Sequence, residues 1–116
     1  MKLISKSSEG LYGEIKIPGD KSISHRALIC ASISDGTSEI SNLQESEDVI
    51  NTLNSLKQLG IRIYKKNESY FVEGKGFKGL RESESQLYFG NSGTGTRLMS
   101  GLLSIQNFSS SLAGDD

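Results

Sequence analysis

The sequence predicts an α/β fold assembled from a repeated unit whose elements follow the order βαβαββ. Two observations support this prediction. Segments with a strand-like alternation of apolar and polar residues take turns with segments whose apolar residues recur at helical spacing. A strand, a glycine-rich turn and a helix then follow one another again from residue 86, which indicates that a second copy of the unit begins there. With 116 residues, the chain is long enough to bury a hydrophobic core.

The predicted strands are short runs that alternate or are rich in β-branched and aromatic residues. The first run ends at Pro18, and two later runs form a hairpin around Lys66-Asn67-Glu68. Residues 74–85 are polar and predict a loop. The predicted strands cover residues 11–17, 37–43, 61–64, 70–73, 86–89 and 107–112.

Three segments predict helices. The first covers residues 22–34, and its middle is apolar nearly all round, so we expect most of it, including Cys30, to be buried. The second follows a cluster of acidic residues, carries leucines at helical spacing and ends at Gly60. The third covers residues 98–105.

Composition and charge exclude several classes of protein. The formal net charge is −1 and the sequence pI is about 5.8, so no global basic field exists and we expect no nucleic-acid partner. No stretch has the length and apolarity of a signal peptide or a membrane span, which predicts a cytoplasmic protein without a membrane partner. Cys30 is the only cysteine, so neither a disulfide framework nor a cysteine-based metal site is expected.

The segment from Pro18 to Ala27 is the first candidate site. A Pro-Gly turn leads into a helix start that is flanked by Lys21 and Arg26. The first turn of a helix offers unpaired N–H groups and a partial positive charge, so added cations favour the binding of a phosphate-sized anion. The alternative is that both cations are solvated, that Ser22 only caps the helix and that Asp20 is a turn residue.

The segment from Gly90 to Arg97 is the second candidate site. It places glycines and hydroxyl side chains between a strand and a helix, an arrangement in which backbone N–H groups can cradle an anion. The alternative is an ordinary tight turn in which Ser92 or Thr94 caps the helix.

Two other phosphate-binding patterns fail in this chain. Gly90 and Gly95 have the spacing of a nucleotide-binding P-loop, but Thr96 stands where that motif requires lysine. Residues 74–79 match the dinucleotide pattern G-x-G-x-x-G, but no amphipathic helix follows them, so we interpret them as a loop.

Two further residues, His25 within the first segment and Asp48 after it, can be explained by a purely structural role. His25 is the only histidine and has no metal-binding companion, so we expect it to form a hydrogen bond rather than to ligate a metal or act as a base. Asp48 lies at the start of the second helix, where an acidic residue is electrostatically favourable. It could also orient a cation of the first site.

Taken together, these segments resemble the 3-phosphoshikimate 1-carboxyvinyltransferase (EPSP synthase) family. One family signature is similar to Pro18-Gly-Asp-Lys-Ser-Ile-Ser-His-Arg-Ala27, and another is similar to Leu87-Tyr-Phe-Gly-Asn-Ser-Gly-Thr-Gly-Thr-Arg97. Between them, Glu47-Asp48-Val49 followed by a leucine-rich helix also fits. The resemblance covers essentially the whole chain, and the separation of the two motifs makes it specific.

The resemblance implies an inside-out α/β barrel of two similar domains, each built from three βαβαββ units, with the active site in the cleft between them. It implies that residues 1–20 hold a strand that belongs to or links the other domain. Residues 21–85 would form the first βαβαββ unit, and residues 86–116 would begin the second. The whole enzyme would be a monomer.

The resemblance also implies an activity. Members transfer the carboxyvinyl group of phosphoenolpyruvate to the 5-hydroxyl of shikimate 3-phosphate and release phosphate, a step of chorismate and aromatic amino-acid biosynthesis. They use no metal and no organic cofactor. Shikimate 3-phosphate would be held by Lys21, Ser22 and Arg26, and Lys21 would also be catalytic.

Phosphoenolpyruvate would be approached by Lys21 and by three residues of the second segment, Asn91, Gly93 and Thr94. Asp48 and Arg97 would support the two sites.

The resemblance ends early, because family members are several times longer. Gly114-Asp115-Asp116 is similar to the start of a further family motif. The resemblance therefore implies that the chain is an N-terminal part of the enzyme. We expect this part not to catalyse the reaction alone. The alternatives are a non-catalytic phosphate-binding module and a truncated relic or incompletely folded fragment. UDP-N-acetylglucosamine carboxyvinyltransferase is a weaker match, because that family carries Lys-Asn where this chain has Lys21-Ser22.

Overall fold

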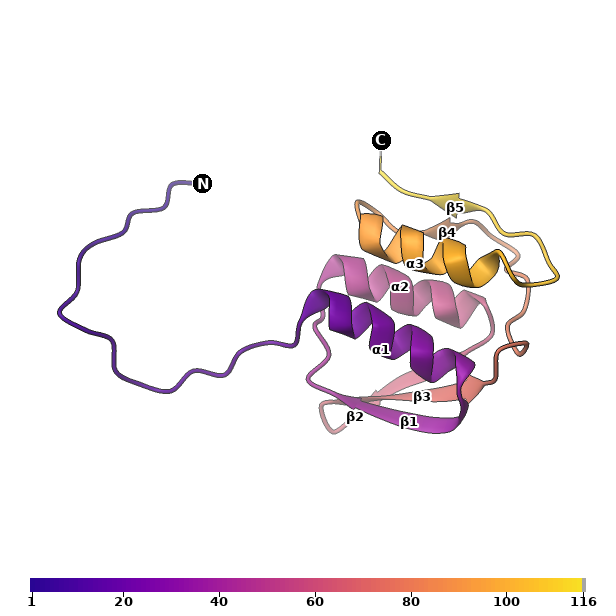
Figure 1. The fold of residues 1–116 in the computed structure, drawn as a ribbon, viewed down its shortest axis with the longest axis horizontal. Helices are drawn as coiled ribbons and strands as arrows, with labels where there is room; N and C mark the ends of the chain where they lie inside the picture. The colour runs from indigo at the N-terminus through magenta and orange to yellow at the C-terminus, as the bar shows by residue number, and fades with distance from the viewer. Residues whose placement is uncertain (116) are drawn as a thin grey trace.

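Three helices lie between a three-stranded sheet and a pair of short strands in the computed structural model, which describes residues 1–115 (Figure 1). The helices are α1 (Lys21–Ile33), α2 (Glu47–Gln58) and α3 (Gly93–Leu103). The strands are β1 (Asp35–Ser41), β2 (Arg62–Lys66), β3 (Ser69–Lys75), β4 (Leu87–Tyr88) and β5 (Leu112–Ala113). The α/β fold class predicted from the sequence is confirmed.

The three-stranded sheet has the order β1-β3-β2, and both outer strands run antiparallel to β3. The β2–β3 hairpin is closed by Asn67 and Glu68, which have φ angles of 49° and 63°. Two consecutive residues with positive φ are typical of the type I′ turns that match the twist of a hairpin. This turn places Lys66 opposite Ser69 and confirms the predicted hairpin.

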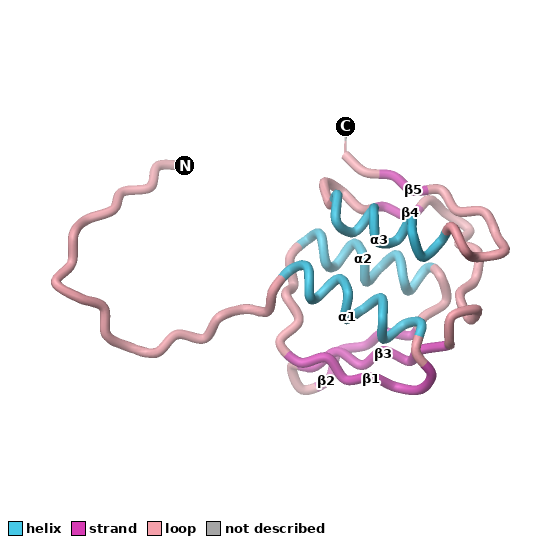
Figure 2. The backbone as a smooth tube through the Cα atoms, viewed as in Figure 1, coloured by secondary structure: helices cyan, strands magenta, loops and turns pink. Residues whose placement is uncertain are grey.

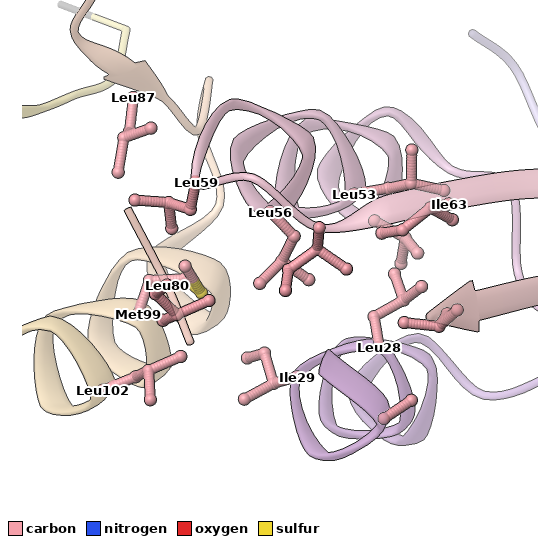
Figure 3. Close-up of a cluster of buried hydrophobic side chains, with 14 of the residues drawn as sticks. Leu28, Ile29, Leu53, Leu56, Leu59, Ile63, Leu80, Leu87, Met99 and Leu102 are labelled. Carbon is pink, nitrogen blue, oxygen red and sulfur yellow. The ribbon is translucent and has the colours of Figure 1, made fainter. Parts of the chain in front are cut away.

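The hydrophobic core lies where the helices meet each other and the sheet. α1 contributes Leu28, α2 contributes Leu53 and Leu56, and α3 contributes Met99, while Ile63 reaches the core from β2 (Figure 3). These side chains are at most 4% exposed. The core therefore fixes how the three helices stand relative to one another, which in turn positions their ends.

All three helices begin on the same side of the molecule, as the tube in Figure 2 shows. Side-chain contacts confirm that α1 and α2 run in the same direction, because Lys21 meets Asp48 and His25 meets Thr52, and the partners are 27 positions apart in the sequence in both pairs. The turn after β4 leads directly into α3. Three positive helix ends are thus gathered on one face.

The strand predicted for residues 11–17 is wrong for this structure. Residues 1–20 contain no helix or strand, and their apolar side chains, including Leu11, Tyr12 and Ile15, are exposed. The segment runs away from the helices (Figure 1). A strand needs a partner for its N–H and C=O groups, and none of the described residues pairs with this one.

Other predicted bounds differ from the observed ones as well, among them those of α3, the last strand and the loop after β3. α3 begins at Gly93 rather than at residue 98, so the glycine-rich turn forms the first turn of the helix. The last predicted strand, 107–112, is reduced to Leu112–Ala113. The predicted loop 74–85 starts late, because β3 continues to Lys75.

Two smaller expectations about α1 are corrected as well. Asp20, and not Ser22, caps the helix, because its carboxylate accepts a hydrogen bond from the N–H of Ile23 at 2.7 Å. Cys30 is exposed rather than buried, because α1 packs through Leu28, Ile29 and Ala31 and leaves this side to solvent. No helix among residues 1–115 combines the length and apolar character needed to cross a membrane.

Candidate functional site

The start of α1 carries the first group of predicted site residues. Lys21 Nζ lies 2.7 Å from Asp48 Oδ2, so an ion pair joins the first turns of α1 and α2. Both side chains remain partly exposed, at 47% and 24%. Lys21 therefore keeps donor capacity toward solvent while Asp48 holds it beside the helix start.

Ser22 and Arg26 lie one turn apart on α1, so they share a face of the helix. Ser22 is half-buried and Arg26 is exposed. Within residues 1–115, the Arg26 guanidinium takes part in no ion pair or side-chain hydrogen bond of the protein. All five of its N–H donors are therefore available to a ligand.

Ser24 fastens the start of α1 to the loop that follows β1. Its hydroxyl donates to the Asp20 carbonyl at 2.8 Å and accepts from the N–H of Gln44 at 3.0 Å. Ser24 is 4% exposed, so this link is shielded from water. The helix start is consequently tied to its surroundings at both Ser24 and Asp48.

The start of α3 carries the second group. Ser92 caps this helix, because its buried Oγ accepts a hydrogen bond from the N–H of Gly95 at 3.1 Å. A hollow of about 270 Å³ opens beside the cap. It is lined by Gly90, Asn91, Ser92, Gly93, Thr96 and Arg97.

Arg97 is the only cation of this second group. Its Nη1 atom lies 3.0 Å from the position that a Cβ would occupy at Gly93, so the guanidinium folds back over the first turn of α3. Asn91 and Gly93 are exposed, and Thr94 is half-buried. The hollow therefore presents backbone groups and one cation to solvent.

A buried hydrogen bond between His25 and Thr52 joins α1 to α2. His25 Nδ1 lies 2.8 Å from Thr52 Oγ1, and both residues are 0% exposed. Burial lowers the pKa of His25, an effect that Asp48 opposes and Lys21 reinforces. This agrees with the prediction that His25 is a hydrogen-bonding neighbour.

Thr52 also touches α3, because a Cβ placed on Gly95 would lie only 2.9 Å from Thr52 Oγ1. Sequence reasoning did not single out this residue. A signal existed, since Thr52 stands between Val49, Leu53 and Leu56 on the buried face of α2, where an apolar residue is expected.

Other polar contacts lie at the edges of this region. The Tyr88 hydroxyl donates to Asp115 Oδ1, and the N–H of Asp115 donates to the Gly90 carbonyl at 3.1 Å. The hydrogen bond to Asp115 is the main cause of a raised Tyr88 pKa. These bonds hold the turn before α3 against the segment that follows β5.

A larger hollow, of about 420 Å³, lies elsewhere, between the linker at Lys16 and the loop after β1. It contains none of the predicted site residues. Its lysines are balanced by acids, since Lys65 Nζ lies 2.5 Å from Glu45 Oε1. This hollow therefore lacks the excess of positive charge that an anion site needs.

Comparison with known proteins identifies relatives of the whole chain. The family described as EPSP synthase (3-phosphoshikimate 1-carboxyvinyltransferase) matches residues 5–116. A 3-phosphoshikimate 1-carboxyvinyltransferase of Streptococcus equi subsp. equi is 47% identical over 116 residues, which are 100% of this chain and 27% of the relative. One of Vesicomyosocius okutanii is 44% identical over 115 residues, which are 99% of this chain and 26% of the relative.

Solved structures give the same result. An EPSP synthase from Acinetobacter baumannii superimposes with a TM-score of 0.83 and 42% sequence identity, over 89% of this chain and 24% of that chain. The chain thus spans about a quarter of the length of the relatives that it matches.

Proposed function

Because the chain belongs to the EPSP synthase (3-phosphoshikimate 1-carboxyvinyltransferase) family, we propose that its gathered helix starts bind shikimate 3-phosphate and phosphoenolpyruvate for carboxyvinyl transfer. In that reaction the 5-hydroxyl oxygen of shikimate 3-phosphate gains the carboxyvinyl group and inorganic phosphate leaves. The observation that carries the proposal is that three helices begin on the same side of the molecule (Figure 2), where the helix starts carry the exposed cations Lys21, Arg26 and Arg97.

The two helix starts suit different ligands. We assign shikimate 3-phosphate to Lys21, Ser22 and Arg26, because a phosphate monoester is matched by side-chain cations with free donors. We assign phosphoenolpyruvate to Lys21 and to the α3 start at Asn91, Gly93 and Thr94. Asp48 and Arg97 act as supports, one holding Lys21 and the other lying over Gly93.

In this proposal the cations act by position and by electrostatics. Two multiply charged anions repel each other in water, and in this proposal Lys21 offsets that repulsion by contacting both. Fixed positive charges that need no rearrangement during the reaction lower its barrier by aligning the reactants and stabilising developing charge.

A binding experiment tests the proposal on the 116-residue chain. Shikimate 3-phosphate is titrated while backbone amide NMR signals are recorded, and we expect shifts centred on Ser22 to Arg26. The variants Lys21→Met and Arg26→Ala each weaken binding by about tenfold, the size expected for one lost charge-assisted hydrogen bond. Lys57→Ala is the matched control, because Lys57 is an exposed cation in the last turn of α2 and should leave binding unchanged.

Two further titrations sharpen the result. UDP-N-acetylglucosamine should cause no shifts at Ser22 to Arg26, because the curated relatives reported above are shikimate 3-phosphate enzymes. With both substrates present, we expect the 116-residue chain to bind without releasing phosphate. If shikimate 3-phosphate added to a saturating concentration shifted no amide signal at the start of α1, the proposal would be contradicted.

A further inference from the structure

Helix α2 touches the starts of both other helices through polar side chains. Asp48 pairs with Lys21 of α1, and one turn later Thr52 bonds to His25 of α1. Thr52 also packs against Gly95 in the first turn of α3. We propose that the Thr52 hydroxyl is a positioning residue that sets the two anion-binding helix starts at a fixed separation. This inference rests on the proposed function.

The surroundings of Thr52 explain why a hydroxyl stands there. The side chain is 0% exposed on the buried face of α2, where a polar group costs free energy unless it is hydrogen-bonded. His25 Nδ1, at 2.8 Å, provides that bond. A valine of the same shape would fill the space equally well, so the hydroxyl contributes a directed contact rather than volume.

The contact toward α3 is close. A Cβ at Gly95 would lie 2.9 Å from Thr52 Oγ1 and 3.0 Å from Ser92 Oγ. Gly95 is therefore enclosed between the cap of its own helix and the hydroxyl of α2. Gly93 and Thr94 lie between Ser92 and Gly95 in the sequence, so fixing these two ends fixes the backbone assigned to phosphoenolpyruvate.

The hydrogen bond from Thr52 to His25 links α2 to the helix turn that carries the residues assigned to shikimate 3-phosphate. His25 lies one turn after Lys21 and next to Arg26, and its ring is completely buried. Its Nε2 atom has no hydrogen-bond partner among the described residues, so the bond to Thr52 is the one that orients the ring. A displaced ring would move the turn that carries Lys21 and Arg26.

A neighbouring residue of α2 holds the other end of the glycine turn. Asn51 Nδ2 would lie 3.0 Å from a Cβ at Gly90. Asn51 and Thr52 therefore contact the turn at its first and last glycines. Of the two, only Thr52 also bonds to α1, so it alone connects the two helix starts.

The test compares Thr52→Val, which keeps the shape and removes the hydroxyl, with Thr52→Ser, which keeps the hydroxyl. In the ligand-free chain, we expect T52V to shift the ring ¹⁵N signals of His25 and the amide signals of Gly93 and Gly95. T52S should leave these signals near their wild-type positions. Shifts of equal size in both variants, or in neither, overturn the inference.

The binding arm uses shikimate 3-phosphate and phosphoenolpyruvate. We expect T52V to weaken both affinities by about tenfold, the loss of one hydrogen bond, and T52S to restore them. Ser55→Ala is the matched control, because it removes another buried hydroxyl of α2 that has no hydrogen-bond partner among the described residues. Should T52V fail to fold, Thr52→Ala takes its place.

The outcomes separate this inference from the function on which it rests. If the wild-type chain binds neither substrate, the proposed function fails, and the ligand-free signals still decide whether Thr52 positions the helix starts. If the wild type binds and T52V binds equally well, the positioning role fails and the proposed function stands. If S55A weakens binding as much as T52V does, the effect belongs to the helix as a whole and the inference is overturned.

Discussion

The starts of α1 and α3 face the same side of the molecule but are built differently. α1 is capped by the Asp20 carboxylate and carries exposed cations. α3 is capped by the Ser92 hydroxyl and begins with two glycines, of which Gly95 packs tightly against α2. In the proposed function, the first start binds its ligand through side-chain charge, and the second through backbone groups that a ligand can approach closely. Substitutions should therefore separate them, since α3 is sensitive to added volume and α1 to lost polar groups.

The largest expected effect is that of Gly95→Ala. The new methyl group would lie 2.9 Å from Thr52 Oγ1, 3.0 Å from Ser92 Oγ and 3.3 Å from Phe89 Cδ1. Overpacking of this kind costs about 1–3 kcal/mol of unfolding free energy. Urea unfolding followed by circular dichroism measures the loss.

Gly101→Ala is the control for this prediction. Gly101 lies in the same helix, and a Cβ there would meet nothing within 4 Å. Alanine is the better helix former, so we expect a gain of about 0.5–1 kcal/mol. If both variants change stability in the same direction, close packing at Gly95 is not what distinguishes the α3 start.

The next effect concerns the cap of α1. Asp20→Ala removes the acceptor of the Ile23 N–H and should lower the unfolding free energy by about 1 kcal/mol. Asp20→Asn keeps an acceptor oxygen without the charge, so it should stay close to wild type in the same urea measurement. A loss in D20N as large as in D20A would mean that the carboxylate charge, rather than the hydrogen bond, stabilises this start.

The same contrast explains what the sequence could predict. The α1 start was placed to within a residue, because Pro18, Asp20 and the cations are strong local signals. The α3 start was placed five residues late, because glycine has low helix propensity, whereas in the structure the Ser92 cap and the packing of Gly95 against α2 support this first turn. Local patterns predicted the hairpin and α2 for the same reason that they predicted α1.

Strand pairing and side-chain burial depend on residues that are distant in the sequence, and two predictions about them were wrong. The run 11–17 has the alternation of a strand but no partner among residues 1–115. Cys30 sits in an apolar run yet faces solvent, because packing selects only one side of α1. All of the predicted site residues except Asp48 lie in two separate motifs. Thr52, which contacts both of these segments, gives only the weak signal of a threonine on an apolar helix face.

The buried link between the two starts should make stability depend on pH. Burial lowers the pKa of His25 below its ordinary value of 6.5 in the folded chain, while in the unfolded chain the imidazole keeps that value. The unfolded chain therefore binds more protons as the pH falls below about 6.5, so this contribution is complete above that pH and is lost below it. We expect a lower urea midpoint at pH 5.5 than at pH 7.5.

His25→Gln serves as the control for the pH prediction. Glutamine does not titrate, so its midpoint should change less between these two pH values, whatever its absolute stability. An equal change in both proteins would assign the pH dependence to other groups.

The smallest effect on stability is expected at Lys21. Its ion pair with Asp48 is partly exposed, and exposed pairs contribute about 0.2–1 kcal/mol, so Lys21→Met should barely move the urea midpoint. The same variant should weaken binding of shikimate 3-phosphate and flatten its dependence on salt, because a charge in solvent contact is screened by ions. Gly95→Ala should show the opposite pattern, with a large loss of unfolding free energy and an unchanged salt dependence of shikimate 3-phosphate binding. If Lys21→Met destabilised the chain as much as Gly95→Ala does, the main role of the Lys21 charge would be to stabilise the fold rather than to bind a ligand.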